Sequence, residues 1–84
     1  MTTTKESRIR ALELAISRGN GVVKFCRALG ITTQAIYHWK KRGWVPADKA
    51  LVIESIFGVP REDMIEPTLL KLISEPYKPA EDIL

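Results

Sequence analysis

The segment from Val22 to Lys41, VVKFCRALGITTQAIYHWKK, constrains the fold of this 84-residue chain more than any other. Its large apolar residues recur at helical intervals on both sides of Gly30, which predicts two short helices that close on each other across a bend. Gly30 is expected to end the first helix in the left-handed conformation, and the Thr32 hydroxyl to cap a second helix that begins near Thr33. The apolar residues in question are Phe25, Leu29, Ile31, Ile36 and Trp39.

The second predicted helix carries a polar outer face. When Ile36 and Trp39 turn inward, Lys41 and four polar residues before it share the opposite side of the helix. Two helices joined by a tight turn are typical of helix-turn-helix proteins, which insert the second helix into the major groove and read bases mainly with its N-terminal residues. We therefore expect base contacts from Thr33, Gln34, Tyr37 and His38.

The chemistry of these side chains suits base edges. The Gln34 amide matches the donor and acceptor pattern of adenine, and the Thr33 methyl group suits thymine. Tyr37 and His38 come one turn later, where either a base edge or a phosphate is within reach. The simpler alternative is a solvated helix start without a ligand. A metal site is not expected, because His38 is the only histidine and Cys26 falls on the core face, and no cofactor is expected either.

Positive charge is concentrated in the part of the chain that contains this motif. Residues 1–49 hold ten Lys and Arg against three Asp and Glu, whereas residues 50–84 hold three against seven. Such an asymmetry favours a polyanionic partner for the first part. We expect phosphate contacts near the two helices, including one through an N-cap at Asn20, although ordinary solvated charge is the alternative. The expected phosphate-binding residues are Asn20, Lys24, Arg27, Lys40, Lys41 and Arg42.

Together with the two helices described above, the rest of the sequence predicts a compact all-α domain of five helices. Thr4 can cap a first helix that runs to about Arg18. Pro46 suits position N1 of a fourth helix, which is expected to bury most of its surface until Gly58 ends it. A short helical turn over 61–65 completes the set. Trp39 is assigned to the core, whereas Trp44 either packs over the junction between the third and fourth helices or lies near the DNA backbone.

Two regions follow from this pattern. Residues 1–67 form the expected DNA-binding domain, and residues 68–84 form a short, partly flexible extension with a possible role in oligomerisation. The six-residue run over 68–73 fits either a strand or a helical turn. Self-association is expected to depend on the apolar residues after Gly58, which are Met64, Ile65, Leu69, Leu70, Leu72 and Ile73.

Length and composition exclude several classes of protein. A chain of this size, with 45% hydrophobic residues, supports one small core and leaves little for a buried catalytic cavity, so no enzyme activity is expected. The single cysteine permits no internal disulfide, and no apolar run is long enough for a signal region or a membrane span. These features favour a cytoplasmic protein, nucleoid-associated when bound to DNA, with no membrane partner.

The segment from about Ala11 to Pro67 resembles the Cro-like helix-turn-helix proteins of lambdoid prophages, and especially the YdaS-like family of antitoxin and Cro-type regulators. The resemblance rests on RALGI over 27–31, QAI over 34–36, Trp39-Lys40 and VPA over 45–47, together with the GNG turn over 19–21. It implies a five-helix, lambda-repressor-like domain that represses phage promoters by binding operator DNA. Alanine is usual at Cys26 and a polar residue at Val22, and residues from Thr68 are not covered.

The direction of control stays open. The segment from Trp39 to Pro46 is also similar to the tetrameric lysogeny activator of lambdoid phages, so activation is an alternative to repression. Double-stranded operator DNA is the expected partner, bound by a homodimer or higher oligomer, because one recognition helix covers few base pairs. An alternative of a different class is an antitoxin-like protein that neutralises a toxin through its acidic C-terminal half, and contact with polymerase is a further possibility.

Overall fold

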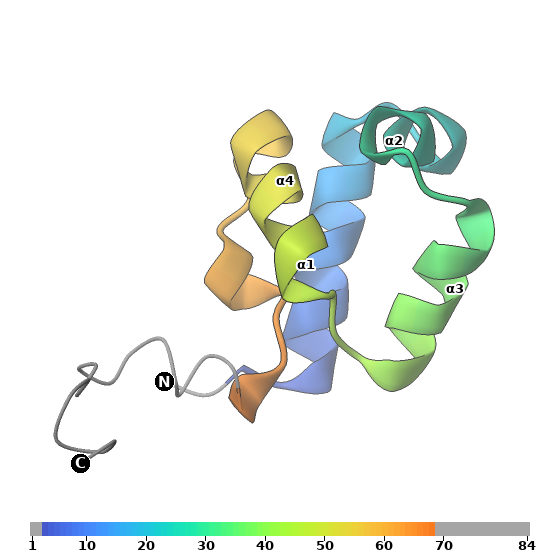
Figure 1. Cartoon of the computed structure of the whole chain (residues 1–84). Coiled ribbons are helices and arrows are strands. Elements are labelled where there is room, and N and C mark those ends of the chain that lie inside the picture. The colour runs from blue at the N-terminus through green and yellow to red at the C-terminus, as the bar shows by residue number, and fades with distance from the viewer. Residues whose placement is uncertain (1–2, 69–84) are drawn as a thin grey trace, which may run out of the picture.

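A computed structural model of the chain describes residues 3–68, which form an all-α domain (Figure 1). α1 packs against α2 and α4, α3 packs against α2, and α2 crosses the end of the domain at which α1 finishes. No helix within residues 3–68 has the length and apolar character needed to cross a membrane. The elements are α1 (Lys5–Arg18), α2 (Val22–Leu29), α3 (Thr33–Arg42), α4 (Ala47–Phe57) and the 3-10 turn η1 (Arg61–Asp63).

The expected all-α class is confirmed, but within residues 3–68 the expected five helices are four α-helices and a 3-10 turn. In place of a helical turn over 61–65, the structure has three residues of 3-10 helix, with Pro60 directly before them. Such a short element is common as a connector, because the 3-10 geometry closes a turn with few residues. The ambiguous run over 68–73 lies outside the described residues from position 69 onward.

Most helix ends follow the sequence signals. The Thr4 hydroxyl oxygen accepts the Ser7 N–H at 3.0 Å, and the Ser7 hydroxyl oxygen accepts the Thr4 N–H at the same distance, so both residues cap α1. Gly30 and Gly58 end α2 and α4 with φ of 68° and 72°, a left-handed conformation that strongly favours glycine. The predicted starts of α1 and α3 and the end of α4 are thus confirmed.

Three predictions about caps were wrong in detail. Asn20 does not cap α2, because it adopts a left-handed conformation itself (φ 64°) and Gly21 occupies the N-cap position. Thr32 is at the N-cap of α3, yet its side chain makes no capping hydrogen bond. Pro46 lies at the N-cap rather than N1 of α4, so the helix begins one residue later than expected.

Phe25 forms the centre of the core. Its side chain is completely buried, and its ring stacks on Phe57 of α4 with 5.1 Å between centroids. A Cβ atom on Gly19 would lie 3.2 Å from both rings, so the turn after α1 passes closely over this stack. The other buried apolar residues are Leu12, Ala15, Ile16, Cys26, Leu29, Ile36, Trp39, Val45, Ala50, Ile53, Val59, Met64 and Ile65.

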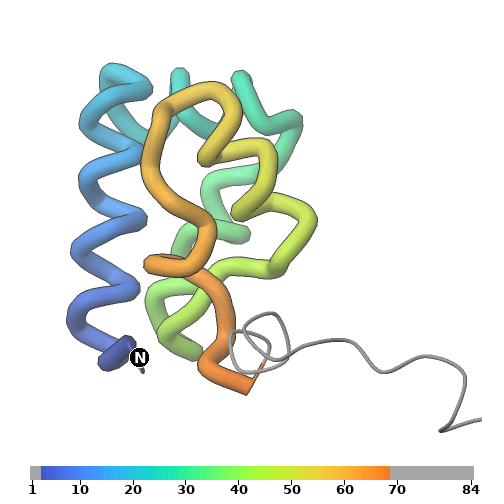
Figure 2. The backbone as a smooth tube through the Cα atoms, turned by 90° about the vertical axis from the view of Figure 1, so that its left-hand side faces the viewer, coloured from blue at the N-terminus to red at the C-terminus, as the bar shows by residue number. Residues whose placement is uncertain are grey.

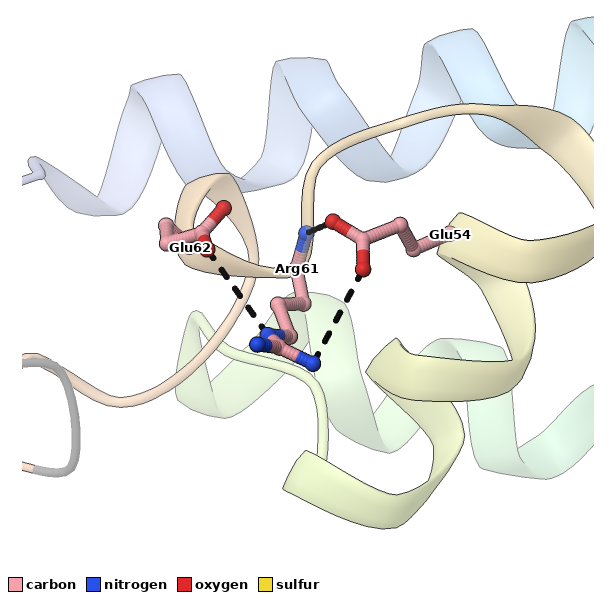
Figure 3. Close-up of polar contacts among 3 residues, drawn as sticks. All are labelled: Glu54, Arg61 and Glu62. Carbon is pink, nitrogen blue, oxygen red and sulfur yellow. Dashed lines mark hydrogen bonds and ion pairs between the residues drawn. The ribbon is translucent and has the colours of Figure 1, made fainter. Parts of the chain in front are cut away.

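The segment after α4 lies against α1 and α4 and completes the core (Figure 2). Met64 and Ile65 are at most 1% exposed, and the Val45 N–H donates to the Met64 carbonyl oxygen at 2.8 Å. Glu54 accepts the Arg61 N–H at 3.0 Å and lies 3.9 Å from its guanidinium, which anchors η1 to α4 (Figure 3). Met64 and Ile65 are therefore buried within the domain, and neither side chain is exposed for the self-association predicted from the sequence.

α4 buries less of its surface than expected. Only Ala50 and Ile53 are fully buried, because α4 packs along one side, against α1, α2 and η1. Leu51, Val52 and Ile56 project away from the core and remain 47%, 39% and 52% exposed. We call these three residues the α4 apolar face.

Two arginines of α1 bind the ends of other helices. Arg8 is buried, and its Nε–H donates to the carbonyl oxygen of Gly43 at the end of α3, while Nη1 donates to Thr3. Arg18 Nη1 donates to the Phe57 carbonyl oxygen at the end of α4 at 2.7 Å. The last carbonyls of a helix lack partners and carry partial negative charge, so both contacts are electrostatically favourable.

Replacing Arg8 with methionine should lower the free energy of unfolding by about 1.5–3 kcal/mol, the range for hydrogen bonds to charged groups. Methionine fills a similar apolar volume but leaves the Gly43 carbonyl without its donor. Urea unfolding followed by circular dichroism measures the change. Arg10→Met is the matched control, because Arg10 is exposed on the same helix. Equal stability of the two variants would contradict a structural role for Arg8.

Candidate nucleic-acid interface

The turn between α2 and α3 is fixed by the backbone and by one side chain. The Ile31 N–H donates to the Cys26 carbonyl oxygen at 3.0 Å, and the Cys26 thiol donates to the Thr32 carbonyl oxygen at 3.6 Å. Burial raises the pKa of the Cys26 thiol, because desolvation disfavours the thiolate, so the thiol remains a neutral donor. Together with the left-handed Gly30, these contacts set the direction in which α3 leaves α2.

α3 packs through its apolar side and exposes the other. Ile36 and Trp39 are 4% and 5% exposed, and they fix the rotation of α3 about its own axis. The four predicted base-reading residues project into solvent on the opposite side and line one shallow hollow of the surface. We call this surface, formed by Thr33, Gln34, Tyr37 and His38, the α3 outer face.

The α3 outer face presents groups suited to reversible recognition. Tyr37 is 68% exposed, and its ring meets the edge of His38 with 6.2 Å between centroids. Within residues 3–68, no side chain of this face hydrogen-bonds to the rest of the domain. A hydroxyl, an amide, a phenol and an imidazole are therefore all free to donate to or accept from a ligand.

The three consecutive basic residues at the end of α3 point in different directions, since successive helical residues are separated by about 100°. Lys40 is half-buried on the side facing α1, where its Nζ lies 3.8 Å from Glu13 Oε1. Lys41 is exposed and continues the α3 outer face. Arg42 folds back over the Trp44 ring, with its guanidinium carbon 3.7 Å from the ring centroid. The structure thus groups Lys41 with the α3 outer face and separates Lys40 from it.

The remaining predicted phosphate-binding residues lie on or before α2. Lys24 and Arg27 are exposed on the side of α2 opposite Phe25 and Cys26. Asn20 is exposed in the turn that precedes α2. The two basic residues are three positions apart and are neighbours on the helix surface, and exposed Val23 lies beside them, so this part of α2 is charged but not continuously polar.

Sequence reasoning missed the residues that hold the basic end of α3. Glu13 and Arg8 belong to α1, more than twenty positions upstream, and helical periodicity gives no signal for such pairs. The Arg42 and Trp44 contact spans two residues, and an arginine near a tryptophan after a glycine turn is the local signal that predicts it.

Within residues 3–68, no three His, Cys, Asp or Glu side chains gather closely enough to hold a metal ion. Comparisons with protein-family models, with curated proteins and with solved structures find no match to this chain.

If the α3 outer face reads bases, Gln34→Ala should cost about 1–3 kcal/mol on the preferred duplex and flatten the preference at one base pair. Lys41→Ala should weaken binding to all sequences about equally. Lys40→Ala should change binding less than Lys41→Ala, because Lys40 faces Glu13. Fluorescence anisotropy on matched and mismatched duplexes measures all three variants. An equal loss for Lys40 and Lys41 would contradict the assigned directions of the two side chains.

Proposed function

We propose that this protein is a sequence-specific DNA-binding transcription regulator of the helix-turn-helix type, as its resemblance to Cro-like and YdaS-like prophage proteins implies. α3 enters the major groove, and Thr33, Gln34, Tyr37 and His38 contact base edges. The observation that carries the proposal is the α3 outer face, which is polar, exposed and held in place by buried Ile36 and Trp39. Its amide and hydroxyl groups match the pattern of donors and acceptors in the major groove.

The phosphate contacts come from only some of the ten Lys and Arg residues within 1–49. Arg8 and Arg18 bind helix ends, and Lys40 is beside Glu13, so these three cations are engaged within the domain. Of the five cations that the sequence predicts to bind phosphate, four then remain for DNA, which are Lys24 and Arg27 of α2 and Lys41 and Arg42 of α3. About four contacts fix the position of the protein on the duplex, while the α3 outer face supplies the sequence preference.

Regulation follows from occupancy of the operator. A bound repressor occludes polymerase, whereas an activator of similar fold contacts it, and repression is the proposed mode on the resemblance to Cro-type proteins. A dimer places two recognition helices about 34–36 Å apart, so that two half-sites are read on one side of the duplex. The preferred DNA is therefore expected to be a pseudopalindrome.

Selection from a random duplex library should enrich such a sequence, and footprinting should show two protected half-sites. The logarithm of the association constant should fall linearly with the logarithm of the salt concentration. About four contacts per subunit correspond to a slope near −3.6 per subunit, at about −0.9 per contact. A slope near zero, or a library without enrichment, would contradict the proposed function.

The α4 apolar face supports a second proposed role, which is contact with another protein molecule. Leu51, Val52 and Ile56 are exposed together on one helix, although apolar side chains of this size gain free energy when buried. We propose a second copy of the chain as the occupant, since the DNA-binding function requires a dimer. A partner such as a toxin is the alternative occupant.

Ile56→Glu should weaken self-association at least about tenfold, because dimer formation would then bury an unpaired carboxylate. Sedimentation at several protein concentrations measures the change. Leu14→Glu is the matched control, since Leu14 is equally apolar and 47% exposed but belongs to α1. Association that survives Ile56→Glu, or a wild-type protein that is monomeric throughout, would remove the α4 apolar face as the dimer interface.

A further inference from the structure

Arg42 and Trp44 form a compact pair at the end of α3. The Arg42 guanidinium lies 3.7 Å above the Trp44 ring, and Arg42 Nε donates to the Trp44 carbonyl oxygen at 3.4 Å. Among residues 3–68, no carboxylate forms an ion pair with Arg42. The guanidinium is thus held by an aromatic face and a carbonyl, neither of which neutralises its charge.

The residues on both sides of Trp44 are fixed to other parts of the domain. Gly43 has φ of 92°, and its carbonyl oxygen accepts from buried Arg8. Val45 is 1% exposed, and its N–H donates to Met64. Trp44 itself is half-buried. The ring therefore provides a rigid support for a side chain that would otherwise sample many rotamers.

The contact leaves one side of the guanidinium available. With Nε occupied by the Trp44 carbonyl, the two terminal nitrogens remain as a fork, the geometry in which arginine binds two oxygens of one phosphate. Stacking orders the arginine before a ligand arrives, so less side-chain entropy is lost on binding. Arg42 also adjoins His38 along α3, at the edge of the α3 outer face.

We propose that Trp44 is a positioning residue for DNA binding, which acts by holding the Arg42 guanidinium ready for a backbone phosphate. This inference rests on the proposed function and assigns one phosphate contact to a pair of residues. Trp44 does not touch the DNA in this arrangement. The competing explanation is purely structural, in which the methylene groups of Arg42 shield the Trp44 ring from water.

The test compares Trp44→Leu, Trp44→Phe, Arg42→Met and the double variant Arg42→Met/Trp44→Leu on a short mixed-sequence duplex across a range of salt concentrations. Arg42→Met retains the apolar cover and removes the charge. Arg10→Met controls for the loss of one positive charge elsewhere. The position of the Arg42 side chain is monitored without DNA by the ring-current shift of its protons in NMR spectra.

Arg42→Met and Trp44→Leu should each weaken binding about three- to tenfold, and Arg42→Met should also make the salt slope shallower by about 0.9. The double variant should be no weaker than Arg42→Met alone, and Trp44→Phe should restore most of the affinity and the ring-current shift. If Trp44→Leu weakens binding equally with and without Arg42, the positioning role is overturned and the structural explanation holds. If wild-type protein shows no salt-dependent binding, the DNA-binding function itself fails, whatever the NMR spectra show.

Discussion

Both helices that follow the α2–α3 turn end against an arginine of α1. Arg8 donates to Gly43 at the C-terminal end of α3, and Arg18 donates to Phe57 at the C-terminal end of α4, so α1 supplies a donor to the end of each helix. The two arginines are ten residues apart on α1, about 15 Å along its axis. Because a helix carbonyl end is both unsatisfied and partly negative, a cation is the most suitable partner for it. The position of the C-terminal end of α3 relative to the core depends on the contact with Arg8.

The local features of the fold could be predicted from the sequence, because they depend on neighbouring residues. Thr4, Gly30 and Gly58 mark helix ends through backbone preferences that act over a few positions, and Ile36 and Trp39 were assigned to the core by helical spacing alone. The same spacing placed four polar residues on one side of α3. Exposure of the candidate site follows from that placement.

The features that sequence reasoning missed depend on distant parts of the chain. The engagement of Arg8 and Lys40 by other elements needs knowledge of how α1 packs, which periodicity does not supply. Leu51 and Ile56 are exposed because α4 packs against the rest of the domain along one side only. The apolar sequence of α4 had instead predicted that most of the helix surface is buried. Net charge did not predict how many cations are available for phosphate contacts, since cations that bind helix ends count equally with cations that face solvent.

The side chains of the α3 outer face can be substituted independently of the residues that stabilise the fold. No side chain of Thr33, Gln34, Tyr37 or His38 hydrogen-bonds to the rest of residues 3–68, and the buried side of α3 is held by Ile36 and Trp39. Substitutions on the exposed side therefore leave the core, the turn and the helix ends intact. A duplicated gene could acquire a new ligand preference by changing four codons, with no compensating change needed to preserve the fold.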